Sequence, residues 1–307
     1  MSLESILQSI EPVVVNESEM RSFDREAPFF RLAFDLMRET SQWVCLFASV
    51  NYSVAPTWNV RQAILGGHFV RLFKLNRLLL DNVNERRGEL IWVLLRAAAE
   101  CVINVRYILA NPSDETFSSY LQHSLQYERD LLRRIERNIE ARGDAPLPIE
   151  ERMRRSIIRT FDRSQVTIDS LPQKRIRDWA GKNLFQKAES LGLDQAYFAI
   201  IGGPSRNVHG GWRDLLEHHL RCEVDGQFTP DLEFSELRRP QPLFAIASMT
   251  VPALDEYSQF LGAPELERVR PLLSDLHRRI ALADELHEEY LQRRPNRPLN
   301  PSAAGDS

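Results

Sequence analysis

Arg96 and Glu100 are the residues of this sequence whose types and spacing most directly suggest chemistry. They stand four residues apart within an almost wholly apolar run from 90 to 109, so on a helix they lie side by side. A helix that is apolar on nearly every face is buried on most sides, and charges inside it must be paired. The pattern predicts either an ion pair that fixes the helix in its bundle or one wall of an internal polar pocket. Asn104 and Tyr107 continue the same stripe.

A second chemically interesting segment runs from Tyr197 to His209. Two glycines and Pro204 are expected to break a helix there, and a new helix is expected to begin after them. Ser205 and His209 would then share one face. The free N–H groups of the new helix start favour an anion, and Arg206 adds positive charge. The alternative is a kinked core helix with one hydrogen-bonded histidine.

Taken together, the motifs Arg96-x3-Glu100 and, about a hundred residues later, Tyr197-x7-Ser205-x3-His209 resemble those of a large bacterial family. It is a family of all-helical domains of unknown function, and the resemblance covers roughly residues 30–225. The family is distantly similar to the HEPN helical domains (higher eukaryotes and prokaryotes nucleotide-binding). Many of those are metal-independent ribonucleases of toxin–antitoxin and phage-defence systems.

The resemblance implies a catalytic set of His209, Arg96, Glu100 and Ser205. In such a site His209 would act as general acid or base at the ribose 2′-OH or the leaving oxygen, and Arg96 or Arg206 would stabilise the phosphorane. The HEPN hallmark is R-x4–6-H on one helix. Here only two residues separate Arg206 from His209.

His68 follows two glycines and is expected either to face the same pocket as Arg96 or to be a satisfied core histidine. We expect the residues that bind the ligand to be Arg206, Tyr197, His68, Tyr107 and Asn104. The sequence has no P-loop, no G-x-G-x-x-G and no CxxC spacing, and its histidines do not form a metal-ligand pattern. No cofactor and no metal are therefore expected.

The elements that must position these residues are amphipathic helices, because apolar residues recur at i, i+3, i+4 and i+7 and glycine is scarce. Proline and capping signals bound them. Helices are expected at about 27–50, 59–80, 87–109, 114–141, 149–165, 184–191, 194–202, 209–220, 241–260 and 264–291. The fold class is an all-α multi-helix bundle with at most one small β-hairpin near residues 220–229, around Asp225-Gly226.

Four regions are expected along the chain. Residues 1–26 form an N-terminal extension, and 27–222 form the main bundle with the polar motifs. Residues 223–291 form the hairpin and a C-terminal helical pair packed on the bundle, and 292–307 form a disordered tail rich in proline and small residues.

Composition limits the partners. The net charge of −4 argues against a protein that coats nucleic acid with its whole surface, yet residues 120–190 hold 15 basic and 11 acidic side chains. The most apolar stretch, 43–50, is too short to span a membrane, and the N-terminus lacks a secretory pattern. We expect a cytoplasmic protein with reduced thiols that binds RNA or a nucleotide, or a protein partner, or a second copy of itself, and no membrane.

Two functions stay open. The first is a HEPN-like ribonuclease or nucleotide-acting protein of a bacterial defence or toxin system. The second is a non-catalytic helical scaffold that binds a partner protein or small ligand. The first predicts an accessible polar pocket, and the second predicts that the same residues form a closed network. Whether the protein is an enzyme is left undecided by the residues alone.

Overall fold

Long apolar and amphipathic helices make up the centre of the fold, as the sequence periodicity predicts. The computed structural model describes residues 7–54, 57–202, 210–235 and 239–294. The central helices share one hydrophobic core. They are α3 (Glu26–Val54), α4 (Val60–Asn84), α5 (Gly88–Ala110), α12 (Gln241–Leu261) and α13 (Arg270–Arg293). The predicted all-α bundle is confirmed, and the predicted helix ends agree to within a few residues except at the start of α13.

The start of α13 lies later than predicted because Pro264 opens a separate turn. A short 3₁₀ turn, η4 (Pro264–Arg268), precedes the helix. A second proline, Pro271, occupies the first turn of α13, where its missing N–H costs no helical hydrogen bond. The two prolines thus divide one predicted helix into a turn and a helix.

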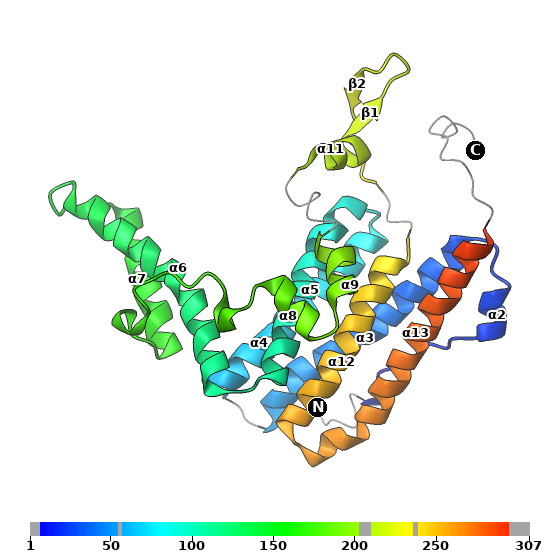
Figure 1. Ribbon diagram of the computed structural model, residues 1–307, viewed down its shortest axis with the longest axis horizontal. Helices are drawn as coiled ribbons and strands as arrows, with labels where there is room; N and C mark the ends of the chain where they lie inside the picture. Colours follow the sequence, from blue (N-terminus) through cyan, green and yellow to red (C-terminus); the bar gives the residue numbers. More distant parts are fainter. Residues whose placement is uncertain (1–6, 55–56, 203–209, 236–238, 295–307) are drawn as a thin grey trace.

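α5 occupies the middle of the bundle, against α4 on one side and α12 on another (Figure 1). Its apolar faces explain this position, because each buried face needs a neighbouring helix. Arg106 of α5 donates to both carboxylate oxygens of Glu256 on α12, at 2.7–3.1 Å. The helix ends at Asn111, before Pro112, as the proline predicts.

Helices α6 (Asp114–Glu140) and α7 (Pro148–Ser164) form an antiparallel arm that projects from the bundle (Figure 1). The arm has a small hydrophobic core of its own. Gln126 ties the returning chain to α6, since its amide donates to the carbonyl of Ile176 and accepts from the N–H of Ile176, both at 2.7 Å. The end of α7, near Arg163, therefore lies beside the start of α6 and α4, on the side of the bundle from which the arm projects.

Shorter elements follow the arm. They are the 3₁₀ turns η1 (Ile168–Ser170) and η2 (Trp179–Gly181), the helices α8 (Leu184–Ser190) and α9 (Asp194–Tyr197), and a π-helical turn, η3 (Phe198–Gly202). Of these, α8 and η3 pack against α5. Helix α11 (Trp212–His218) leads into the hairpin of β1 (Leu220–Cys222) and β2 (Phe228–Pro230). The strands are antiparallel with Leu220 opposite Pro230, which confirms the predicted hairpin.

Within the N-terminal extension, the short helix α2 (Glu17–Arg21) packs against α13. Most of the predicted tail, 295–307, lies outside the described residues. No helix in the described part of the chain combines the length and apolarity needed to cross a lipid bilayer.

Candidate functional site

The central feature of the site is the ion pair of Arg96 and Glu100 on α5. The guanidinium Nε donates to the Glu100 carboxylate at 3.1 Å, one turn along the helix. The Arg96 side chain is 25% exposed and that of Glu100 is 38% exposed. The helix is buried along most of its length, as predicted, but the prediction that these charges are buried is wrong. A ligand from solvent can reach the pair.

Asn104 and Tyr107 follow the pair along α5 toward the bundle interior. The side-chain oxygen of Asn104 is buried and accepts no hydrogen bond among the described residues. Tyr107 is buried, and its ring meets the ring of Trp179 edge-on at 5.4 Å. The stripe therefore changes from solvent-reaching charges at Arg96 to aromatic packing at Tyr107.

Trp179 also connects Tyr107 to His68 on α4. Its ring contacts Tyr120 of α6 edge-on at 5.4 Å, and the Tyr120 hydroxyl lies 2.9 Å from Nε2 of His68. Lys187 of α8 lies over the Trp179 ring at 4.0 Å. These contacts form a continuous chain from α4 to α8. Two of its members, Tyr107 and His68, were expected from the sequence.

His68 is 9% exposed, and its Nδ1 has no hydrogen-bond partner among the described residues. Burial, with a smaller effect from the positive charge of Arg71, lowers the pKa of His68 to about 4. Burial also raises the pKa of Tyr120 and raises that of the Cys101 thiol to about 11. All three groups are therefore neutral at pH 7.

Lys187 is the buried cation of this region. Its ammonium donates to the carbonyl of Lys182, and burial lowers its pKa to about 8. Its side chain also lies 5.6 Å from the Tyr107 ring. The aromatic faces of Trp179 and Tyr107 attract the charge, and the nearby Asp178 carboxylate favours it as well.

Tyr197 lies half-buried at the end of α9, where its ring meets Phe185 edge-on at 5.3 Å. The turn that follows it, η3, packs against α5. The remaining predicted site residues, Ser205, Arg206 and His209, lie outside the described residues. Their predicted meeting with Arg96 stays a prediction.

A closed, buried ion pair does exist, but it lies elsewhere. Arg279 of α13 donates to both carboxylate oxygens of Glu39 on α3 at 2.6 and 2.7 Å, and also to the carbonyl of Val13 at 2.8 Å. The two side chains are 9% and 2% exposed. This pair has the enclosure that the sequence suggested for Arg96 and Glu100.

His68 lines a groove of about 360 Å³ between α4 and the bases of α6 and α7. Neither Arg96 nor Glu100 lines this groove, so His68 belongs to a separate site. Arg71, Tyr120 and Arg163 line it as well, and none of them was singled out from the sequence. The spacing of His68 and Arg71, three residues apart on one helix, was the available signal.

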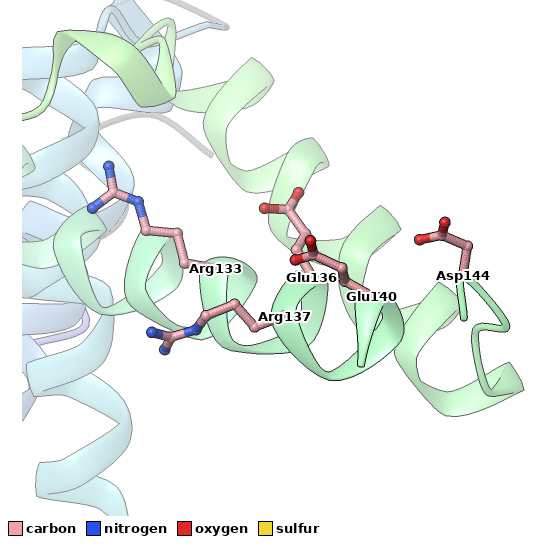
Figure 2. Close-up of a pocket in the computed structure, with 5 residues that line it drawn as sticks. All are labelled: Arg133, Glu136, Arg137, Glu140 and Asp144. Carbon is pink, nitrogen blue, oxygen red and sulfur yellow. The ribbon is translucent and has the colours of Figure 1, made fainter. Parts of the chain in front are cut away.

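A larger cavity of about 560 Å³ lies on the far part of the arm. Figure 2 shows the guanidinium groups of Arg133 and Arg137 lying apart from the carboxylates of Glu136, Glu140 and Asp144. All five side chains are exposed. Among the described residues no group of three or more metal-ligand side chains is placed to hold a metal ion. This surface is therefore a solvated helix face of mixed charge.

The fold and its central helix define an all-helical domain with a solvent-reaching ion pair. The model of a family of unknown function (DUF5677) matches residues 62–228, more than half of the 307-residue chain. The chain belongs to this family, which confirms the family resemblance expected from the sequence. The match begins within α4 and ends at the first residue of β2, so it includes the Arg96–Glu100 pair and every groove residue except Val60. No curated protein and no solved structure matches the chain.

Proposed function

We propose that this protein is a cytoplasmic, HEPN-like, metal-independent ribonuclease or nucleotide-acting protein of a bacterial defence or toxin system. Its reactive site would lie on α5 around Arg96 and Glu100 and would include Ser205 and His209. One observation supports this proposal most strongly. The Arg96–Glu100 pair is accessible to solvent although it stands on the most apolar helix of the bundle. An i,i+4 pair this exposed contributes only about 0.3–0.5 kcal/mol to the stability of a helix, so stability alone gives little reason for two charges on this helix.

The chain on both sides of residues 203–209 is attached to α5. Before them, η3 packs against α5. After them, His218 of α11 pairs with the Ser235 hydroxyl at 2.8 Å. The backbone of Ser235 in turn accepts from the N–H of Gly88 at 2.6 Å and donates to Glu89 at 2.8 Å, both at the start of α5. These attachments hold the described chain on each side of that segment against α5.

The proposed reaction needs no metal. His209 accepts the proton of a ribose 2′-OH, and the 2′ oxygen attacks the phosphorus. Arg96, held by Glu100, neutralises the charge that develops on the phosphorane oxygens. The bond to the 5′ oxygen breaks, and that oxygen leaves with a proton from water. The products are a 2′,3′-cyclic phosphate and a 5′-hydroxyl end.

The test compares wild type with His209→Ala, each expressed in bacteria and each purified. Wild type is expected to slow growth and to cleave RNA in the presence of EDTA, leaving 5′-hydroxyl ends. His209→Ala is expected to do neither. The matched control is His219→Ala, which removes an exposed histidine beside Asp214 and should behave as wild type. Equal behaviour of wild type and His209→Ala would overturn the proposal.

A second candidate, a non-catalytic module that binds a partner protein, is favoured by the surface of α11 and the hairpin. Trp212, Val224, Leu232 and Phe234 are large apolar residues, and each is more than half exposed. The partner proposed is a second copy of the chain. Light scattering should then give a dimer, and Trp212→Ser with Leu232→Ser should give a monomer. A monomeric wild type would exclude this candidate.

A further inference from the structure

The groove between α4, α6 and α7 combines an apolar wall with a basic rim. Val60, Ala63 and Ile64 of α4 and Leu121 of α6 form the apolar part. Gly67 leaves the floor open, because a Cβ there would meet no atom within 4 Å. The volume of about 360 Å³ falls within the range of small-molecule sites.

The basic rim consists of Arg71 from α4 and Arg163 from the end of α7. Both are exposed, and neither forms an ion pair with any residue that the structure describes. No carboxylate lines the groove among those residues. The other cavities differ, since each has carboxylates among its lining residues. The groove alone among these four therefore presents uncompensated positive charge.

Polar groups also face the groove from His68 and Tyr120. A neutral His68 ring carries one N–H and Tyr120 carries one O–H. The single hydrogen bond between Nε2 of His68 and the Tyr120 hydroxyl uses one of these two hydrogens. If the hydroxyl donates, the N–H at Nδ1 of His68 is left over, and that atom has no partner among the described residues. If Nε2 donates, the hydroxyl hydrogen is left over. Because Nδ1 of His68 is buried, only the second arrangement leaves a donor at the groove, where the Tyr120 hydroxyl can donate to an acceptor such as a phosphate oxygen.

We propose that this groove binds a phosphate ester of about mononucleotide size, with its phosphate held between Arg71 and Arg163. Guanidinium groups bind phosphate oxygens through paired, charge-assisted hydrogen bonds. The Tyr120 side of the groove supplies a neutral donor, and the apolar wall covers the organic part of the ligand. The site uses no residue of α5, so the inference does not rest on the proposed function.

The test measures binding of adenosine monophosphate, inorganic phosphate and adenosine by calorimetry at low salt. Adenosine monophosphate is expected to bind wild type more tightly than either of the other two. The double variant Arg71→Gln, Arg163→Gln should bind it at least about tenfold more weakly, because each lost charged hydrogen bond contributes about that factor. The matched control is Arg77→Gln, Arg152→Gln. It makes the same charge change on the same two helices, at exposed residues outside the groove, and should bind as wild type.

A second variant, Gly67→Leu, separates the groove from general surface charge. It keeps both arginines and fills the open floor, where the structure has room for a side chain. Binding should be lost. Wild-type affinity in Gly67→Leu would overturn the proposal. So would equal loss in the two double variants, binding of adenosine as tight as that of its monophosphate, or no binding of any probe to wild type. None of these results bears on RNA cleavage by the α5 site.

Discussion

Two arginine–glutamate pairs of this protein have the same chemistry and opposite settings. Arg279 and Glu39 are enclosed between α13 and α3, and their charges are matched by further hydrogen bonds. Arg96 and Glu100 share one contact on α5 and reach solvent. The enclosed pair joins residues 240 apart in the sequence, whereas the open pair joins two residues of one helix. The difference indicates that the first pair holds the bundle together, whereas for the second we propose a role toward a ligand.

The largest expected effect is on the enclosed pair. Glu39→Ala leaves the buried Arg279 guanidinium with only the half-exposed Asp275 carboxylate and the Val13 carbonyl as partners among the described residues, so the free energy of unfolding should fall by about 3 kcal/mol, the lower end of the range for a broken buried pair. Urea denaturation measures this change. If Glu39→Ala and Glu100→Ala cost the same, the distinction between the two pairs is lost.

The next largest effect on the free energy of unfolding is expected at His68, which is buried and has no charged partner in the described part of the chain. The pKa of His68 in the folded protein is about 4, below its usual 6.5, so the unfolded chain takes up the proton first as pH falls. Its contribution to stability is complete above about pH 6.5 and is lost toward pH 4. His68→Gln removes this titration. Between pH 7 and 4.5, wild type should therefore lose roughly 2–3 kcal/mol more than the variant. Parallel losses would contradict the burial of a neutral His68.

The Arg106–Glu256 pair lies between the two extremes, with side chains 14% and 32% exposed. Glu256→Ala removes three charged hydrogen bonds but leaves Arg106 partly in contact with water. We expect a loss of about 1.5–3 kcal/mol by urea denaturation. A smaller loss of stability than that of Glu100→Ala would show that the cost of breaking an ion pair does not follow how far the pair is enclosed.

The smallest effect is expected at the open pair. Glu100→Ala should change the free energy of unfolding by less than about 1 kcal/mol, because solvent screens the charge that remains on Arg96. Thermal and urea unfolding should agree on this result. A loss as large as that of Glu39→Ala would assign Arg96 and Glu100 a structural role.

The helices could be predicted from the sequence, because their periodicity and their caps are local. Ser113 caps α6 through the N–H of Thr116 at 3.2 Å, as its position before two acidic residues indicates. The burial of the ion pairs could not be predicted. The apolar neighbours of Arg96 suggested enclosure, but the enclosure of a charge depends on which helices pack over its face. Nothing local connects Glu39 with Arg279.

The groove could be predicted only in part for the same reason. His68 and Arg71 share a helix, and their spacing was visible. Arg163 reaches the groove because the arm turns back on itself, with α7 antiparallel to α6. That return depends on the turn between the helices and on the core of the arm. Charge counts over residues 120–190 indicated a basic region but not which arginines lie together.

The central claim is that Arg96 and Glu100 serve a reaction rather than the fold. Arg96→Gln tests it most directly when RNA cleavage in EDTA and the free energy of unfolding are measured on the same preparation. The account predicts that cleavage falls at least about a hundredfold, while the free energy of unfolding stays within about 1 kcal/mol of wild type. Cleavage at the wild-type rate, or a loss of stability of about 3–5 kcal/mol as at a buried pair, would contradict it.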